Sequence, residues 1–102
     1  MDLVFRALAD ESRRALLDSL SAKSAQTLNE LCSGLSMTRQ AVSKHLAILE
    51  EANLVATVKR GREKLHYLNP VPIAEIANRW IRKFERHRVD ALVDLKRTLE
   101  SE

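Results

Sequence analysis

The first twenty residues carry apolar side chains at the spacing of an α-helix, with polar side chains between them. Apolar positions within residues 3–8 predict a short first helix. Asp10 can accept hydrogen bonds from the first free amides of a second helix, whose apolar stripe lies within residues 16–20. The polar run at residues 23–26 predicts a loop after this stripe. The chain is therefore expected to begin with two short helices.

The next two helices are predicted from the residues at their ends. Thr27 and Glu30 match a capping box, in which the threonine hydroxyl accepts from the Glu30 amide and the Glu30 carboxylate accepts from the Thr27 amide. Gly34 is expected to end this helix in the left-handed conformation. Thr38 can cap the following helix, which Asn53 would end. Two helices joined by a short turn that contains glycine form a candidate helix-turn-helix.

The second helix of this pair has two faces of different chemistry. When residues are placed at intervals of about 100°, Val42, Leu46 and Leu49 share one face, which must pack on a core. The opposite face offers hydrogen-bonding groups, one cation and one small residue, and its N-terminal half holds no acidic residue. By itself this pattern fits a binding face and a merely solvated face equally well. The residues of this face are Gln40, Ser43, Lys44 and Ala47.

A β-hairpin is predicted between residues 54 and 68, because two segments rich in β-branched and apolar residues flank a turn centred on glycine. The turn is expected at residues 59–63, where three of the five side chains are cationic. Prolines at positions 70 and 72 end the hairpin and fit the first turn of a final helix. The hairpin is therefore expected to have a strongly cationic tip.

No helix-breaking residue occurs between Ile73 and about Glu100, and apolar residues recur at helical spacing along this stretch. One helix of that length would measure about 40 Å, whereas a compact chain of this size has a radius of gyration of about 13 Å. Part of the apolar stripe must therefore extend beyond the chain's own core, and we expect a second copy of the chain to cover it. The expected dimerisation helices are residues 1–9 and 72–101, with interface residues Val4, Phe5, Leu8, Trp80, Phe84, Leu92, Leu95 and Leu99.

Length and composition favour one mostly helical domain, residues 1–102, since glycine and proline occur only twice each. The net charge of +3 and the pI of about 9.4 suit a nucleic-acid partner without requiring one. Cys32 is the only cysteine, which excludes a disulfide framework within the chain and suits a reducing cytosol. There is no basic leader and no run of roughly 18 apolar residues. We therefore expect a cytoplasmic protein with no membrane association.

The motif Ser43-Lys44-His45-Leu46, followed by Leu49-Glu50-Glu51-Ala52, is quite specific. Together with residues 8–17 and 61–68, it makes the chain resemble the ArsR family of bacterial winged-helix repressors. At Asn53 the family usually has glycine, and asparagine also tolerates the left-handed conformation. The resemblance implies a mainly α-helical winged helix-turn-helix, with a two-stranded β-hairpin as the wing and a long C-terminal dimerisation helix.

Within that fold the helix-turn-helix is expected at residues 27–52 and the wing at residues 54–68. The resemblance implies that the polar helix face contacts base edges and phosphates in the major groove, where glutamine can bind adenine and lysine can reach guanine or phosphate. Wing cations would contact phosphates near the minor groove. His45 lies nearer the core face, so a packing or capping role and a DNA contact are both open. The expected DNA-binding residues are Thr38, Arg39, Gln40, Ser43, Lys44, His45, Lys59, Arg60, Arg62 and Lys64.

The implied function is that of a sequence-specific transcription regulator, a repressor that binds a two-fold symmetric operator in double-stranded DNA as a homodimer. The alternative is a protein-interaction module that keeps the winged-helix scaffold without DNA binding. The cationic wing and the acid-free face argue against that alternative, although a turn that is only solvated could have the same composition. No catalytic constellation and no glycine-rich phosphate loop stands out, so we do not expect an enzyme.

Many members of the family sense metals, but this chain lacks both of the family's ligand sets. Residues 30–34, Glu-Leu-Cys-Ser-Gly, lack the second cysteine of the family's Glu-Leu-Cys-x-Cys site, and a lone thiolate cannot supply the soft ligands that zinc or arsenic needs. Glu85-Arg86-His87 is similar to half of the other site, but no histidine follows it. Residues 80–85 instead resemble the metal-independent branch. We expect no cofactor and no metal effector, with Cys32 either a small buried residue or a redox switch.

Overall fold

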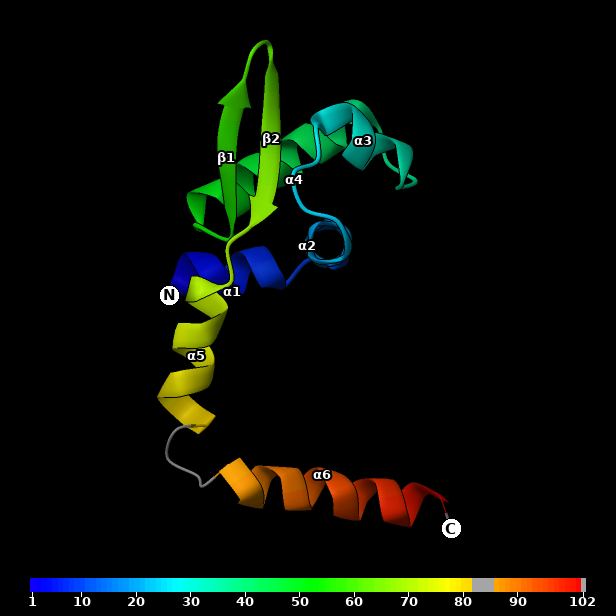
Figure 1. The fold of residues 1–102 in the computed structure, drawn as a ribbon, viewed down its shortest axis with the longest axis vertical. Coiled ribbons are helices and arrows are strands. Elements are labelled where there is room, and N and C mark those ends of the chain that lie inside the picture. The colour runs from blue at the N-terminus through cyan, green and yellow to red at the C-terminus, as the bar shows by residue number, and fades with distance from the viewer. Residues whose placement is uncertain (82–85, 102) are drawn as a thin grey trace. The chain divides into compact units, whose positions relative to one another are not determined.

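The computed structural model describes residues 1–81 and 86–101, with side chains for residues 1–81 and 92–100. The chain divides into two compact units, Met1–Pro72 and Ile73–Glu102. The single domain expected from the chain length stays a prediction. The elements in chain order (Figure 1) are α1 (Asp2–Leu8), α2 (Glu11–Ala22), α3 (Leu28–Ser33), α4 (Arg39–Glu51), β1 (Val55–Arg60), β2 (Glu63–Leu68), α5 (Val71–Ile81) and α6 (Arg86–Ser101).

The helix starts predicted from the sequence are confirmed. The Asp10 carboxylate accepts hydrogen bonds from two amides in the first turn of α2, at 2.7 and 3.4 Å. At the start of α3, Thr27 Oγ1 accepts from the Glu30 amide at 3.2 Å, and Glu30 Oε1 accepts from the Thr27 amide at 3.1 Å. Thr38 Oγ1 caps α4 by accepting from an amide at 3.1 Å. Each cap satisfies amides that the helix itself leaves unpaired.

The turn between α3 and α4 differs from its prediction. Gly34 has a φ of −92°, so the expectation that α3 ends in the left-handed conformation is wrong. A right-handed turn ends the helix instead, with the Leu35 amide donating to the Cys32 carbonyl at 3.4 Å, and the chain reaches Thr38 without a positive φ. Asn53 does adopt the predicted left-handed conformation after α4, with a φ of 62°.

The core of the first unit consists of leucine, valine and alanine side chains from α1, α2, α3, α4, the segment before β1 and the start of β1. The predicted core face of α4 is confirmed, since Val42, Leu46 and Leu49 are at most 3% exposed. Burying a leucine contributes about 1.5–3 kcal/mol, so this packing decides which face of α4 stays at the surface. The largest fully buried side chains are Leu16, Leu20, Leu31, Val42, Leu49 and Leu54.

The hairpin predicted between residues 54 and 68 is confirmed, with a shorter turn than expected. β1 and β2 pair antiparallel from Val55 opposite Leu68 to Arg60 opposite Glu63. Because the strands stay paired up to this point, the turn is Gly61-Arg62 and not the whole of residues 59–63. Gly61 has a φ of 63°, which a two-residue hairpin turn requires and glycine adopts readily.

Gln26 anchors the base of this hairpin, the wing, to the loop between α2 and α3. Its backbone pairs with His66 of β2, with N–O distances of 3.2 and 2.8 Å. Its buried side chain donates to the carbonyl oxygens of Ser19 and Lys23 at 3.0 and 2.8 Å. The wing is therefore held by the helical part of the unit as well as by its own strand ladder.

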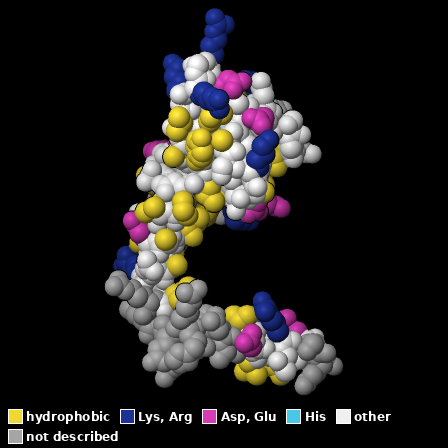
Figure 2. Space-filling model, viewed as in Figure 1, with side chains coloured by type: hydrophobic (Ala, Val, Ile, Leu, Met, Phe, Trp, Pro, Cys, Tyr) yellow, Lys and Arg dark blue, Asp and Glu magenta, His cyan; other side chains and the backbone are white. Residues whose placement is uncertain are grey.

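The C-terminal part of the chain contains two described helices, α5 and α6, where the sequence predicts one. Continuity between them depends on residues 82–85, which lie outside the described residues, as does the predicted interface residue Phe84. Apolar side chains are exposed on both helices (Figure 2): Trp80 and Ile81 on α5, and Leu92, Val93, Leu95 and Leu99 on α6. Among the described residues, no helix has the length and apolar character needed to cross a membrane.

Candidate nucleic-acid interface

α4 presents the polar face that its periodicity predicts. Gln40, Ser43, Lys44 and Ala47 are all exposed, on the side of the helix away from its buried leucines. The first turn contains no acidic residue. Thr38 is exposed as well, and its hydroxyl is engaged in capping the helix. α4 therefore offers hydrogen-bonding groups and positive charge on a helix whose first turn is capped.

The wing carries its cations toward its tip, where Figure 2 shows lysine and arginine side chains at the end of the hairpin. Lys59 lies opposite Lys64 in the strand ladder, and Arg60 lies opposite Glu63. Two cations directly opposite each other repel. This repulsion is relieved because Lys64 Nζ lies 3.0 Å from Glu50 Oε1 on α4. All four predicted wing cations, Lys59, Arg60, Arg62 and Lys64, are exposed.

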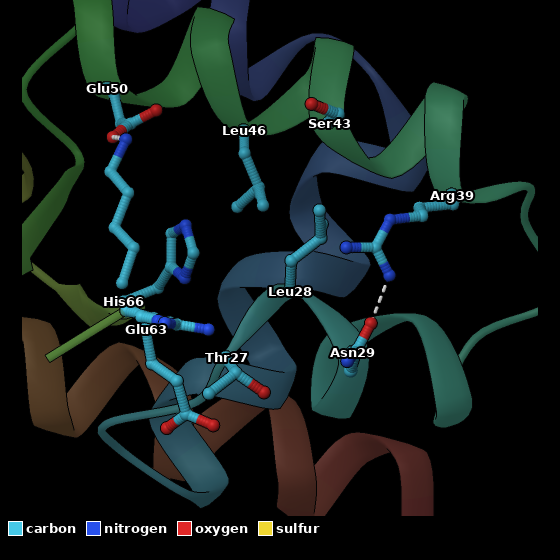
Figure 3. Close-up of a pocket in the computed structure, with 11 residues that line it drawn as sticks. Thr27, Leu28, Asn29, Arg39, Ser43, Leu46, Glu50, Glu63 and His66 are labelled. Carbon is cyan, nitrogen blue, oxygen red and sulfur yellow. Dashed lines mark hydrogen bonds and ion pairs between the residues drawn. The ribbon is translucent and has the colours of Figure 1, made fainter. Parts of the chain in front are cut away.

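The wing, α3 and α4 line an open cavity of about 320 Å³ (Figure 3). Two of the cations that line it have partners on the protein. Arg39 donates to Asn29 Oδ1 on α3, and Lys64 pairs with Glu50 on α4. The sequence pattern does not identify Asn29 or Glu50, because both contacts join different elements and depend on how those elements pack. The predicted DNA-binding residues brought together here are Arg39, Ser43, Arg62 and Lys64, whereas Gln40 and Lys44 do not line the cavity.

His45, whose role the sequence leaves open, is half-buried on the side of α4 that meets α2. Its Nδ1 lies 3.4 Å from Arg13 Nη1. That contact supplies a packing partner, and contact of His45 with DNA stays a prediction.

Two carboxylates of this unit have lowered pKa values because they cap helices. A hydrogen bond from the Ser12 amide is the main cause that lowers the pKa of Asp10. The Thr27 amide, followed by the Lys23 ammonium 3.0 Å away, lowers the pKa of Glu30. Both groups are therefore ionised at neutral pH and serve the helix starts.

Comparison with known proteins identifies the family. A family model of a helix-turn-helix domain matches residues 8–58. The HTH-type transcriptional regulator YuzN of Bacillus subtilis (strain 168) is 40% identical over 86 residues, covering 78% of this chain and 94% of the relative. The structure of an ArsR-like transcriptional regulator from Rhodococcus sp. RHA1 matches with a TM-score of 0.73 and 32% identity, over 99% of this chain and 91% of that one. The chain belongs to the ArsR family of helix-turn-helix transcriptional regulators.

This ArsR-family regulator is also similar to the arsenical resistance operon repressor of Escherichia coli (strain K12), at 33% identity over 67 residues, 66% of this chain and 57% of the relative. These relatives are transcription regulators, so this protein is a DNA-binding regulator and not an enzyme. The mainly helical winged helix-turn-helix fold, with a two-stranded hairpin and C-terminal helices, is confirmed.

The predicted dimer residues of the regulator differ in how much surface they expose within one chain. Val4 is 8% exposed and packs mainly against its own unit, whereas Phe5 is 44% exposed and Leu8 is half-buried. Trp80 is half-exposed, and the Arg79 guanidinium lies 5.4 Å from its ring centroid. Contact of these residues with a second copy stays a prediction, as it does for the exposed Leu92, Leu95 and Leu99.

A metal site also stays untested in this regulator. Cys32 is half-buried. Among the side chains that the structure describes, no three histidine, cysteine, aspartate or glutamate groups come together to hold a metal ion. The side chain of His87 is not one of those described, so the Glu85-Arg86-His87 segment, which is similar to half of the family's second metal site, lies outside this comparison.

Proposed function

We propose that this ArsR-family regulator is a cytoplasmic repressor that binds a two-fold symmetric operator in double-stranded DNA as a homodimer. The observation that carries the proposal is the exposed polar face of α4, with no acidic residue in its first turn, beside a cationic wing in the same compact unit. A helix of this kind fits the major groove, and a hairpin beside it can reach neighbouring phosphates. DNA is the partner whose shape and charge match both elements.

In this proposal the two elements have different tasks. Gln40 and Ser43 bind base edges, because they are exposed in the first half of α4 and carry hydrogen-bonding groups of suitable length. Lys44, Arg60 and the other cations of the wing bind phosphates, which adds affinity but little discrimination between sequences. Thr38 and Arg39 help mainly by holding the start of α4 in place for DNA binding, since each forms a hydrogen bond within the protein.

The homodimer is supported by the apolar side chains that one chain leaves exposed. Leu92, Leu95 and Leu99 of α6 are between 54% and 66% exposed. Apolar side chains spaced along one helix in this way are commonly covered by a partner. Two identical subunits related by a two-fold axis present two recognition helices, which explains why the operator should be symmetric.

Independence of metals is the second part of the proposal. The relatives include a repressor named for arsenical resistance and a cadmium sensor from Mycobacterium tuberculosis, whose structure matches with a TM-score of 0.60 at 29% identity. The support for a different behaviour here is the Glu-Leu-Cys-Ser-Gly sequence at residues 30–34, which holds one thiolate where several soft ligands are needed.

Selection of bound DNA from a random pool tests the proposal. We expect a palindromic motif with half-sites about one helical turn apart. Log affinity should fall with log salt concentration with a slope of several units, because each phosphate contact contributes about 0.9. Addition of zinc, cadmium or arsenite should leave the affinity unchanged within a small factor. Absence of any enriched sequence, together with salt-insensitive binding, would favour the protein-interaction module instead.

A further inference from the structure

Two histidines of the first unit each use Nδ1 to attach a DNA-facing element to the rest of that unit, but the nitrogen has opposite roles in the two. His66 Nδ1 on β2 lies 2.9 Å from the Gln26 carbonyl oxygen. A carbonyl only accepts, so this nitrogen is a donor. His45 Nδ1 on α4 lies 3.4 Å from Arg13 Nη1. A guanidinium only donates, so this nitrogen is an acceptor.

Arg13 is a junction between three helices. Its Nε donates to the Ala7 carbonyl at 2.9 Å, and its Nη2 donates to the Arg6 carbonyl at 3.0 Å, both near the C-terminal end of α1. Its Nη1 lies 3.4 Å from Asp10 Oδ2 at the start of α2, and its side chain is only 15% exposed. These contacts hold the planar guanidinium in place on α1 and α2, which gives His45 of α4 a fixed point of attachment.

We infer that Arg13 and His45 are positioning residues for DNA binding, which set the rotation of α4 against α1 and α2 and so aim the Gln40 and Ser43 face. The inference rests on the proposed DNA-binding function. Leucine and valine packing by itself tolerates small rotations, whereas a hydrogen bond to a held guanidinium is directional. Neither Arg13 nor His45 needs to touch DNA to have this effect.

The hydrogen bond from Arg13 to His45 Nδ1 exists only while the His45 imidazole is neutral. Protonation places a hydrogen on Nδ1, which can then no longer accept, and sets a second cation against Arg13. The Asp10 carboxylate also faces the pair and interacts with both residues. α1 contributes backbone carbonyl oxygens. Attraction to Asp10 offsets part of the repulsion but cannot restore the lost acceptor.

Protonation should not break the Nδ1 hydrogen bond of His66, so His66 serves as a comparison for His45 within the same protein. Its Nδ1 already donates to Gln26, and a protonated imidazole donates in the same way. Mild acid is therefore expected to release α4 from Arg13 while the base of the wing keeps its bond.

Two amide variants separate positioning from other roles. His45→Asn places an amide oxygen close to the position of Nδ1 and can accept from Arg13, whereas His45→Gln carries its oxygen farther out. Glutamine is the better helix former, so a general loss of helix stability would harm the asparagine variant more. We expect His45→Asn to keep the wild-type affinity for the selected operator. His45→Gln should bind it about three- to tenfold more weakly, comparable with the loss of one hydrogen bond of typical net strength. Thermal unfolding of both variants checks that they fold.

A pH series on the wild type supplies a second readout. As the pH is lowered from about 7.5 to about 5.5, wild-type affinity relative to His45→Asn should fall by a similar factor. A His45 that contacted DNA directly would gain a charge and bind more tightly in acid. Equal affinities of the asparagine and glutamine variants, or tighter wild-type binding in acid relative to His45→Asn, would overturn the inference alone. Failure of the wild type to select any DNA would overturn the proposed function and this inference with it.

Discussion

Lys64 on β2 forms an ion pair with Glu50 on α4, with Nζ and Oε1 3.0 Å apart. The two residues line the cavity between the wing and α4 (Figure 3), so the pair joins the two elements that are proposed to contact DNA. Their side chains are 55% and 28% exposed, and ion pairs so open to water add little stability. The main consequence is electrostatic, because Glu50 neutralises one cation of the DNA-facing surface.

Glu50→Gln should therefore strengthen DNA binding. The substitution removes a carboxylate near the phosphate path and releases Lys64 to contact phosphate, so the salt dependence should steepen by up to about 0.9 per subunit. Glu51→Gln is the matched control, since it changes the same charge at the next position, and Glu51 does not line the cavity. Titrations at several salt concentrations measure both variants. Equal effects of the two would mean that only the net charge matters.

Gln40→Ala and Arg60→Ala should affect binding in different ways. Loss of a base contact by Gln40→Ala should cost about 1–3 kcal/mol on the selected operator and relax discrimination at one base pair per half-site. Arg60→Ala should weaken operator and scrambled DNA alike and lower the salt slope by about one per subunit. Affinities for both DNAs at two salt concentrations make the comparison. If Arg60→Ala alone alters the ratio of operator to scrambled affinity, the wing discriminates between sequences.

Leu92→Arg should shift the protein from dimer to monomer. Leu92 is 66% exposed in one chain, so a charge there is tolerated by the monomer but would be buried without a partner in the proposed interface. Asp94→Arg places the same side chain on the polar side of α6 and should leave the dimer intact. Sedimentation at micromolar concentration distinguishes the two outcomes. A wild-type protein that sediments as a monomer would remove the dimer from the proposal.

Thr27→Ala should destabilise the first unit by about 1 kcal/mol, because it leaves the Glu30 amide without its cap. Thr27→Ser keeps a hydroxyl at the same place and should restore most of the loss. Denaturant unfolding of the three proteins measures the difference. If the Thr27 side chain has no capping role, the alanine and serine variants should have equal free energies of unfolding.

Acid should weaken the fold through the two capping carboxylates. The pKa of Asp10 lies below its ordinary value of 3.8, and that of Glu30 lies below 4.5. A lowered pKa in the folded state means that the stabilisation is complete above the ordinary value and is lost as pH falls through the folded one. We expect the free energy of unfolding of the wild type to decrease below about pH 4.5. The Asp10→Asn, Glu30→Gln double variant should show a smaller decrease between neutral pH and this acidic range.

Features that depend on neighbouring residues could be predicted from the sequence. The Thr27–Glu30 capping box, the Asp10 cap and the Val42, Leu46 and Leu49 face are confirmed, because each arises from residues within one or two turns of a helix. Gly34 shows the limit of this reasoning. Glycine permits the left-handed conformation but does not impose it, and here the path to α4 needs only a right-handed turn.

Contacts between distant segments were decided by the tertiary structure. Arg13 with His45, Gln26 with His66, and Glu50 with Lys64 are separated by many residues, and each residue taken singly looks like an ordinary polar side chain. A periodic pattern specifies which face of a helix or strand is apolar, whereas the partner of a polar group depends on how packed elements are rotated and spaced. The sequence by itself therefore determined the elements and the face of α4 that can meet DNA. Packing of those elements decided which cations are neutralised and how α4 is held, because hydrogen bonds and ion pairs form only at distances that the assembled core sets.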